Sequence, residues 1–180
     1  MNEVTIENII SSLALSTPLD LPRLAETLPL ATYYPEETPL LSLTFEQPKA
    51  ACLLFPNGKI KITGPTSHDD IVKTLRQLRT MLNNPAINAD DPAIYHIDQV
   101  VASTTLEIPL DLEQVQTILP LNHVTYNPKQ FPGVVYTMEY PKTVIVVFTS
   151  GKLVALGASL EDVTQALTQV TRDLSILEAK

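Results

Sequence analysis

The sequence predicts an α+β fold in which one unit of antiparallel strands and helices occurs twice. Short apolar runs rich in β-branched residues predict strands at 132–139, 144–148 and 152–156, and turn residues join each strand to the next. A stretch of the same character, PLLSLTFEQPKAACLLFPNGKIKITG, occurs earlier, at 39–64. Because strands joined by such short turns pair antiparallel, each stretch predicts a small antiparallel sheet.

The two stretches are copies of each other. Residues 39–64 align with 132–157 at a spacing of 93 positions, and the upstream segments align at a spacing of 91. A copy of roughly 90 residues is too long for a solenoid repeat, so it indicates a fold made of two similar halves. The aligned identities are Ile6 and Ile97, Pro18 and Pro109, Leu19 and Leu110, Asp20 and Asp111, Leu21 and Leu112, Pro29 and Pro120, Glu46 and Glu139, Pro48 and Pro141, Lys49 and Lys142, Phe55 and Phe148, Gly58 and Gly151, Lys59 and Lys152, and Gly64 and Gly157.

Each copy is predicted to begin with a strand and a short helix. In the first copy the strand covers 4–13, the helix begins at Asp20 with Pro22 in its first turn, and Pro29 ends it. The second copy repeats this order from a strand at 96–106. The other strands of the first copy are predicted at 30–34, 39–46, 49–55 and 59–63, with Glu36 and Glu37 at the tip of the loop after the first of these.

A longer amphipathic helix is predicted to close each copy, at 67–82 and at about 159–177. Ser159 with Asp162 resembles a capping box in which Asp replaces Glu. Beside the apolar stripe of the first helix lies a basic patch that is either a solvated helix face or a docking site. The stripes are Ile71, Leu75, Leu78 and Leu82, and Val163, Leu167, Val170, Leu174 and Leu177; the basic patch is Lys73, Arg76 and Arg79.

The duplication predicts three regions: a first repeat at 1–84, a linker at 85–94 and a second repeat at 95–180. The linker falls in the polar, proline-containing stretch NNPAINADDPA, 83–93.

The composition predicts a globular protein that needs no disulfide or metal to fold. The chain has 180 residues, 44% of them hydrophobic, and one cysteine, Cys52, which suits a buried strand position. No run is long enough to span a membrane, and the acidic N-terminus does not resemble a signal peptide, so we expect a soluble, intracellular protein. His68, His96 and His123 lie in unrelated contexts, so we expect no metal, no cofactor and no catalysis.

Three motifs carry a resemblance to a known family. The segments IENIISSLALSTPLDL, YNPKQFPGVVY and PKTVIVVFTSGKLVALG resemble the TATA-box-binding protein family over about residues 4–177. Because the sequence shows no long N-terminal extension, we expect an archaeal-type member. The resemblance implies a pseudo-twofold saddle: one curved antiparallel sheet from both repeats, with helices on the convex face and DNA under the concave face.

The resemblance also implies which residues contact DNA. Phenylalanine wedges are expected at Phe55, Phe131 and Phe148, whereas Thr38 occupies the fourth wedge position. The first repeat keeps the hydrogen-bonding pair Asn8 and Thr63; in the second repeat Gln99 replaces an asparagine and Leu156 replaces a threonine or serine. Apolar groove contacts are expected from Ile10, Val101 and Val154, with Lys61 in place of a valine. Thr44 and Thr137 stand where relatives often carry phosphate-binding arginines, and the phosphate contacts retained are Lys49, Lys59, Lys142 and Lys152.

The net charge of the chain is −8, whereas DNA-binding surfaces are normally basic. DNA binding therefore requires that the positive charges gather on one face. The lysines of the strands and their loops, which include Lys129, predict a basic concave face. The acids are expected elsewhere, at the terminus, the helix starts and the linker; an acidic protein with ordinary solvated lysines is the alternative. These acids are Glu3, Glu7, Asp69, Asp70, Asp90, Asp91, Glu161 and Asp162.

The function implied is transcription initiation by binding A·T-rich, TATA-like promoter DNA in the minor groove. The expected partners are a transcription factor B-type protein and the RNA polymerase machinery, docked in part through the second-repeat loop that contains Asn127, Pro128, Lys129 and Gln130. We expect a monomer or weak homodimer, cytoplasmic and nucleoid-associated in an archaeon or nuclear in a eukaryote. Two alternatives remain: a divergent paralogue that acts as a protein-binding regulatory module with weak or no DNA affinity, and a remnant of a nucleic-acid enzyme's accessory domain.

Overall fold

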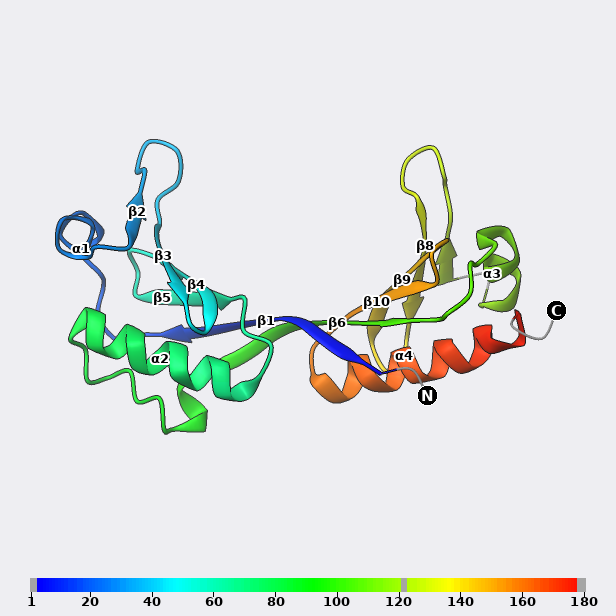
Figure 1. Cartoon of the computed structure of the whole chain (residues 1–180). Helices are drawn as coiled ribbons and strands as arrows, with labels where there is room; N and C mark the ends of the chain where they lie inside the picture. Colours follow the sequence, from blue (N-terminus) through cyan, green and yellow to red (C-terminus); the bar gives the residue numbers. More distant parts are fainter. Residues whose placement is uncertain (1–2, 121–122, 178–180) are drawn as a thin grey trace. The chain divides into compact units, whose positions relative to one another are not determined.

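The computed structural model describes residues 3–120 and 123–177 and shows the same order of elements twice (Figure 1). In each copy a long strand and a short helix precede a meander of strands and a long closing helix. The first copy contains β1 (Thr5–Ala14), α1 (Leu21–Thr27), β2 (Ala31–Tyr33), β3 (Leu41–Glu46), β4 (Lys49–Leu54), β5 (Lys59–Thr63) and α2 (His68–Leu82). After a 3-10 turn, η1 (Pro92–Ile94), the second contains β6 (His96–Thr105), α3 (Leu112–Ile118), β7 (Val124–Thr125), β8 (Gly133–Met138), β9 (Thr143–Phe148), β10 (Lys152–Gly157), α4 (Leu160–Leu174) and η3 (Ser175–Leu177).

The chain forms two compact units. The first unit is Asn8–Asp98, and the second combines the chain from Gln99 onward with the N-terminal residues up to Glu7. The strand order is β2-β3-β4-β5-β1 in the first unit and β6-β10-β9-β8-β7 in the second. All pairings within these sheets are antiparallel, which confirms the predicted α+β class and the duplication.

The alternation of side chains gives each sheet one buried face. In β5, Ile60 and Ile62 are fully buried, whereas Lys59, Lys61 and Thr63 are exposed or partly exposed. Because successive side chains of a strand point to opposite faces, these two sets lie on opposite sides of the sheet. In the second unit α4 packs against β9 and β10. We call the face opposite the buried side chains the open face of each unit.

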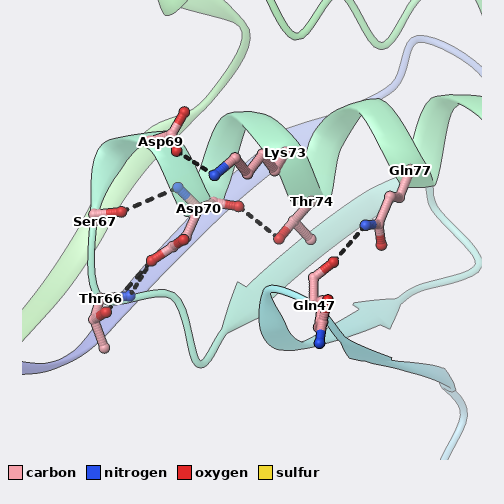
Figure 2. Close-up of polar contacts among 8 residues, drawn as sticks. All are labelled: Gln47, Thr66, Ser67, Asp69, Asp70, Lys73, Thr74 and Gln77. Atoms are coloured by element: carbon pink, nitrogen blue, oxygen red, sulfur yellow. Dashed lines mark hydrogen bonds and ion pairs between the residues drawn. The ribbon is translucent and has the colours of Figure 1, made fainter.

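A serine caps the start of each long helix, at Ser67 and at the predicted Ser159. Ser67 caps α2 by accepting a hydrogen bond from Asp70 N at 3.1 Å, and Ser159 caps α4 in the same way through Asp162 N (Figure 2 for α2). Gln77 Nε2 donates to Gln47 O at 2.6 Å and thereby ties α2 to the β3–β4 turn. The structure confirms both predicted N-termini.

Most of the predicted basic patch on α2 is paired with acids. Lys73 Nζ lies 2.5 Å from Asp69 Oδ2, and Arg76 Nη2 lies 2.6 Å from Asp90 Oδ1. All four side chains are more than half exposed, so these pairs contribute little to stability. The patch therefore has the character of a solvated helix face rather than of a free cationic surface.

The helices and the linker differ in two respects from what the sequence predicts. The closing helix of the second repeat ends at Leu174 and continues as the 3-10 turn η3, so it is shorter than predicted. In the polar stretch between the repeats, Ile87 is fully buried and the Asp90 carboxylate binds Arg76, so this stretch packs within the first unit. Local polarity predicted the absence of strands and long helices there, but not this packing.

Cys52 fills a fully buried position on β4, as expected of a structural residue. Burial raises the pKa of its thiol to about 12. The thiolate is the reactive form, so this side chain is inert in the folded protein.

Across residues 3–120 and 123–177, no helix has both the length and the apolar character that crossing a membrane requires.

Candidate nucleic-acid interface

The open face of the first unit mixes polar, charged and apolar side chains. Register places Ser12, Lys61, Leu53 and Ser42 side by side in one row across β1, β5, β4 and β3. Thr63, Ala51 and Thr44 form the neighbouring row, so Lys61 and Thr63 are close neighbours on the same face. Ile10 lies two residues before Ser12 and therefore belongs to this face.

Asn8 and Thr63, the predicted hydrogen-bonding pair of the first repeat, touch each other. Asn8 Oδ1 accepts a hydrogen bond from Gly64 N at 2.6 Å, and Asn8 Nδ2 donates to Thr63 Oγ1 at 3.1 Å. The first bond fixes the orientation of the carboxamide, because a backbone donor can be satisfied only by the oxygen. The structure therefore brings together one amide and one hydroxyl as a pre-oriented polar pair on the open face.

The centre of the second unit's open face is apolar, and its polar side chains lie at the ends of the rows. Val154 and Val146 are register partners in one row, which ends at Ser103 on β6 and Val135 on β8. The neighbouring row consists of Val101, Leu156, Val144 and Thr137. Gln99, two residues before Val101, is on the same face, and Leu156 offers it no hydrogen-bonding partner where the first unit has Thr63.

Phe131 and Phe148 form an aromatic pair at one end of the second unit's open face. Their ring centroids are 6.1 Å apart and the planes are inclined by 58°. Phe131 is 42% exposed, although a large apolar side chain is normally covered, so the pair presents an apolar surface to solvent. In the first unit Phe55 occupies the position equivalent to Phe148, and the exposed Thr38 occupies the position equivalent to Phe131.

Four lysines lie at the two ends of the central hairpins. Lys59 and Lys152 begin β5 and β10, each across a tight turn from Phe55 or Phe148: Phe55 N donates to Lys59 O, and Gly151 N donates to Phe148 O. Lys49 begins β4, and Lys142 immediately precedes β9, at the opposite ends of the strands that lead to the phenylalanines. Each unit therefore carries one cationic side chain beside its aromatic end and one at the far end.

Glu7 departs from the expected separation of charges. Its Oε1 accepts hydrogen bonds from Ser103 Oγ at 2.5 Å and from Lys152 Nζ at 3.4 Å. The bond from Ser103 and the charge of Lys152 hold the pKa of Glu7 below its usual range, so the carboxylate remains charged at neutral pH. The expectation that Glu7 lies apart from the lysine face was wrong, because the first strand contributes its N-terminal residues to the second unit.

Removing the charge of Glu7 should make Lys152 a better anion-binding group. Glu7→Gln is expected to raise affinity for duplex DNA and to steepen the slope of log K against log salt by up to about 0.9, the value of one additional phosphate contact. Asp98→Asn is the matched control: Asp98 accepts from Ser12 Oγ at 2.9 Å but forms no ion pair within the part of the chain that the structure describes. Equal slopes for wild type and Glu7→Gln in fluorescence anisotropy titrations would contradict this role of Glu7.

The second-repeat loop predicted to bind a partner is fully accessible. Asn127, Pro128, Lys129 and Gln130 are all exposed. Gln130 N and Phe131 N both donate to Asn127 O, at 3.0 and 2.9 Å, so the loop is a compact turn that ends at the aromatic pair. In Figure 1 it projects from the sheet of its unit, between β7 and β8.

Sequence reasoning missed several residues of these surfaces. Val135, Val144 and Val146 belong to the open face of the second unit, and their alternation with buried residues was the signal that could have found them. Gly133 and Leu40 each lie two residues after a wedge position, Phe131 or Thr38. They occupy aligned positions of the two repeats, so the exchange of glycine for leucine was visible in the sequence. No sequence signal indicated the contact of Glu7 with Lys152, because these residues are far apart in the chain.

Comparison with known proteins explains this arrangement. The family model described as transcription factor TFIID, or TATA-binding protein, matches residues 3–85 and again 94–177, one match for each repeat. The chain belongs to the TATA-box-binding protein family. It is 39% identical over 175 residues to the TATA-box-binding protein of Picrophilus torridus, covering 97% of this chain and 95% of that protein.

Further relatives agree with the assignment. The TATA-box-binding protein of Thermoplasma acidophilum is 38% identical over 174 residues, which cover 96% of this chain and 94% of that protein. The solved structure of the Methanococcus jannaschii TATA-binding protein matches with a TM-score of 0.75 and 30% identity, over 96% of this chain and 98% of that one. The resemblance inferred from the motifs, including its archaeal character, is confirmed, and the chain has the transcription-factor role of this family.

The described residues show no metal centre. Across 3–120 and 123–177, no three side chains of His, Cys, Asp or Glu gather in a way that could hold a metal ion. His68 instead bonds Tyr95, whose hydroxyl lies 2.6 Å from His68 Nδ1, and His123 Nε2 lies 3.6 Å from Glu139 Oε1.

Proposed function

We propose that this protein binds A·T-rich duplex DNA in the minor groove through the open faces of its two units. The observation that supports this most is the open face of the second unit, which is built on Val101, Val154 and Leu156. At one end of it lies an aromatic pair whose Phe131 ring is exposed. The minor groove presents the same acceptors for A·T and T·A, so its recognition depends on apolar contact, groove width and deformability more than on a base code.

The A·T preference rests on the side chains that would meet the groove floor. A guanine in the minor groove adds an N2 amino group, which an apolar surface can neither accept from nor accommodate closely. The apolar rows of the second unit therefore disfavour G·C pairs. In the first unit the Asn8–Thr63 pair supplies donors for the acceptors N3 of adenine and O2 of thymine.

The phenylalanines are the groups that would bend the DNA. An aromatic side chain inserted between base pairs unstacks them at a cost of a few kcal/mol, offset by the protein surface that the bent duplex then contacts; this family is itself an established example. Phe131 is exposed, Phe148 is half-buried, and the two rings are already paired in the free protein, so little reorganisation precedes insertion. Phe55 supplies the wedge of the first unit.

Recruitment of a transcription factor B-type protein and RNA polymerase completes the proposal. The exposed loop at Asn127, Pro128, Lys129 and Gln130 is the surface that we assign to the partner. Since this loop carries Lys129 and no acid, the matching partner surface should offer acceptors or carboxylates rather than a cluster of arginines. The protein would bind DNA as a monomer.

The test of DNA binding is an anisotropy titration of an A·T-rich promoter duplex at several salt concentrations. With Lys49, Lys59 and Lys142 on phosphates and Lys152 shared between a phosphate and Glu7, log K should fall with log salt with a slope of about −3 to −4, at roughly −0.9 per contact. Lys61→Val removes one charge from the open face and should make the slope shallower. Lys73→Ala, on the solvated face of α2, is the control that should leave it unchanged.

Two results of this titration would contradict the proposal. One is a G·C-rich duplex that binds as tightly as the A·T-rich one. The other is no detectable binding at low salt, which would favour the alternative of a protein-binding regulatory module. The observation behind that alternative is that Lys61 and Thr38 replace an apolar contact and an aromatic wedge in the first unit.

A further inference from the structure

The position of the Phe131 ring depends on the absence of a side chain at Gly133. A Cβ atom built on Gly133 would lie 2.9 Å from Phe131 Cε1 and 3.1 Å from both Val146 Cγ1 and Val147 O. Gly133 is not among the glycines with positive φ, so its backbone does not require glycine. The requirement is for space: the Phe131 ring lies over Gly133, beside Phe148, which is the register partner of Gly133.

The first unit has the same loop with exchanged side chains. Thr38 N donates to Tyr34 O at 3.0 Å, as Phe131 N donates to Asn127 O at 2.9 Å, and Glu37 N repeats the bond of Gln130 N. The loop backbone is therefore preserved. At the position of Phe131 stands Thr38, and at the position of Gly133 stands the half-buried Leu40.

Leu40 lies where an aromatic ring from position 38 would have to rest. The β3–β4 register pairs Leu41 with Leu54, so the next position brings Leu40 opposite Phe55, just as Gly133 is opposite Phe148. Leu41 is fully buried, so the alternation along the strand puts the Leu40 side chain on the open face, beside Phe55. The first unit therefore lacks both a second aromatic ring, because residue 38 is threonine, and the space for one, because residue 40 is leucine.

We propose that Gly133 and Leu40 make the two wedges unequal, so that the protein distinguishes the two ends of its DNA site. The second unit inserts a pair of rings, held by Gly133 as a positioning residue, and the first unit inserts Phe55 backed by Leu40. The preferred duplex has a deformable pyrimidine–purine step at the end bound by the second unit and does not need one at the other end. This inference rests on the proposed minor-groove binding.

One experiment measures ring positions in the free protein. In NMR spectra, wild type should show a nuclear Overhauser effect between the rings of Phe131 and Phe148, which Gly133→Leu should abolish. Thr38→Phe should show no such effect with Phe55, whereas Thr38→Phe with Leu40→Gly should show one. A ring contact with Phe55 in the single variant, or an unchanged contact in Gly133→Leu, would overturn the positioning roles whether or not the protein binds DNA.

A second experiment measures base unstacking by the fluorescence of 2-aminopurine in a duplex with one T-A step and one stiff A-tract end. Wild type should unstack the probe at the T-A end, and Gly133→Leu should lose that signal and bind about fivefold more weakly or worse, the loss of one aromatic–base contact. The double variant Thr38→Phe with Leu40→Gly should gain unstacking when a T-A step replaces the A-tract. Thermal unfolding followed by circular dichroism identifies a variant that has merely unfolded.

The outcomes separate the two proposals. Absence of wild-type binding to any duplex, with the NMR contacts as expected, would overturn minor-groove binding and not the positioning roles. Wild-type binding with equal unstacking at both ends, when both carry a T-A step, would overturn the unequal wedges and leave minor-groove binding intact.

Discussion

Phe148→Ala is expected to weaken binding to an A·T-rich duplex by about 5- to 150-fold, because one aromatic–base contact is worth about 1–3 kcal/mol. Phe148 belongs to a ring pair, so its loss also leaves Phe131 without the partner 6.1 Å away. Phe131→Ala should have a similar effect. Phe55→Ala should cost less, since the first unit has Thr38 in place of a second ring.

The measurement is duplex affinity at one stated salt concentration, together with the bend angle from energy transfer between the duplex ends. Ile176→Ala, at an exposed position beyond α4, controls for the loss of an apolar side chain. The slope of log K against log salt should stay unchanged in all three phenylalanine variants, because no phosphate contact is removed. Equal losses at Phe55, Phe131 and Phe148 would contradict the asymmetry.

Gly151→Ala is expected to destabilise the protein by about 3 kcal/mol or more, because it combines a strained backbone with a clash. Gly151 has φ +84° at the β9–β10 turn, a region that costs an L-residue about 1–2 kcal/mol. A Cβ there would lie 2.3 Å from Leu106 O and 2.5 Å from Ile108 O, which are backbone atoms and cannot rotate away. At about 2–4 °C per kcal/mol, the midpoint of thermal unfolding should fall by about 10 °C.

Gly58 provides the matched comparison in the first unit. It has φ +86°, but a Cβ would lie 2.6 Å from Thr17 O and 3.0 Å from Leu15 O, so Gly58→Ala should cost less than Gly151→Ala. Ser150→Ala, at the exposed neighbour, should be nearly neutral. Gly151 N donates to Phe148 O as Gly58 N donates to Phe55 O, so each turn adjoins a phenylalanine. DNA binding should suffer more in Gly151→Ala, because Phe148 belongs to a ring pair with Phe131. A larger loss of stability in Gly58→Ala would refute the clash argument.

Much of this fold follows from local sequence. Alternation of apolar and polar residues is enough to predict β5, since Ile60 and Ile62 must share one face. Ser67 and Ser159 mark helix starts because their hydroxyls satisfy backbone donors that the first turn leaves free. Because each element occurs in both repeats, a weak sequence pattern in the first repeat could be interpreted from the clearer pattern in the second.

Tertiary structure decided what depends on distant residues. Glu7 meets Lys152 because the chain's first residues pack in the unit that is mainly built from its last, and no local pattern encodes that contact. Polarity placed Ile87 in a linker, yet the side chain is fully buried, because burial depends on what packs against a residue and not on its neighbours in sequence. The position of the Phe131 ring over Gly133 is likewise decided by the tertiary structure. The sequence shows that residue 133 has no side chain, but not which ring occupies that space.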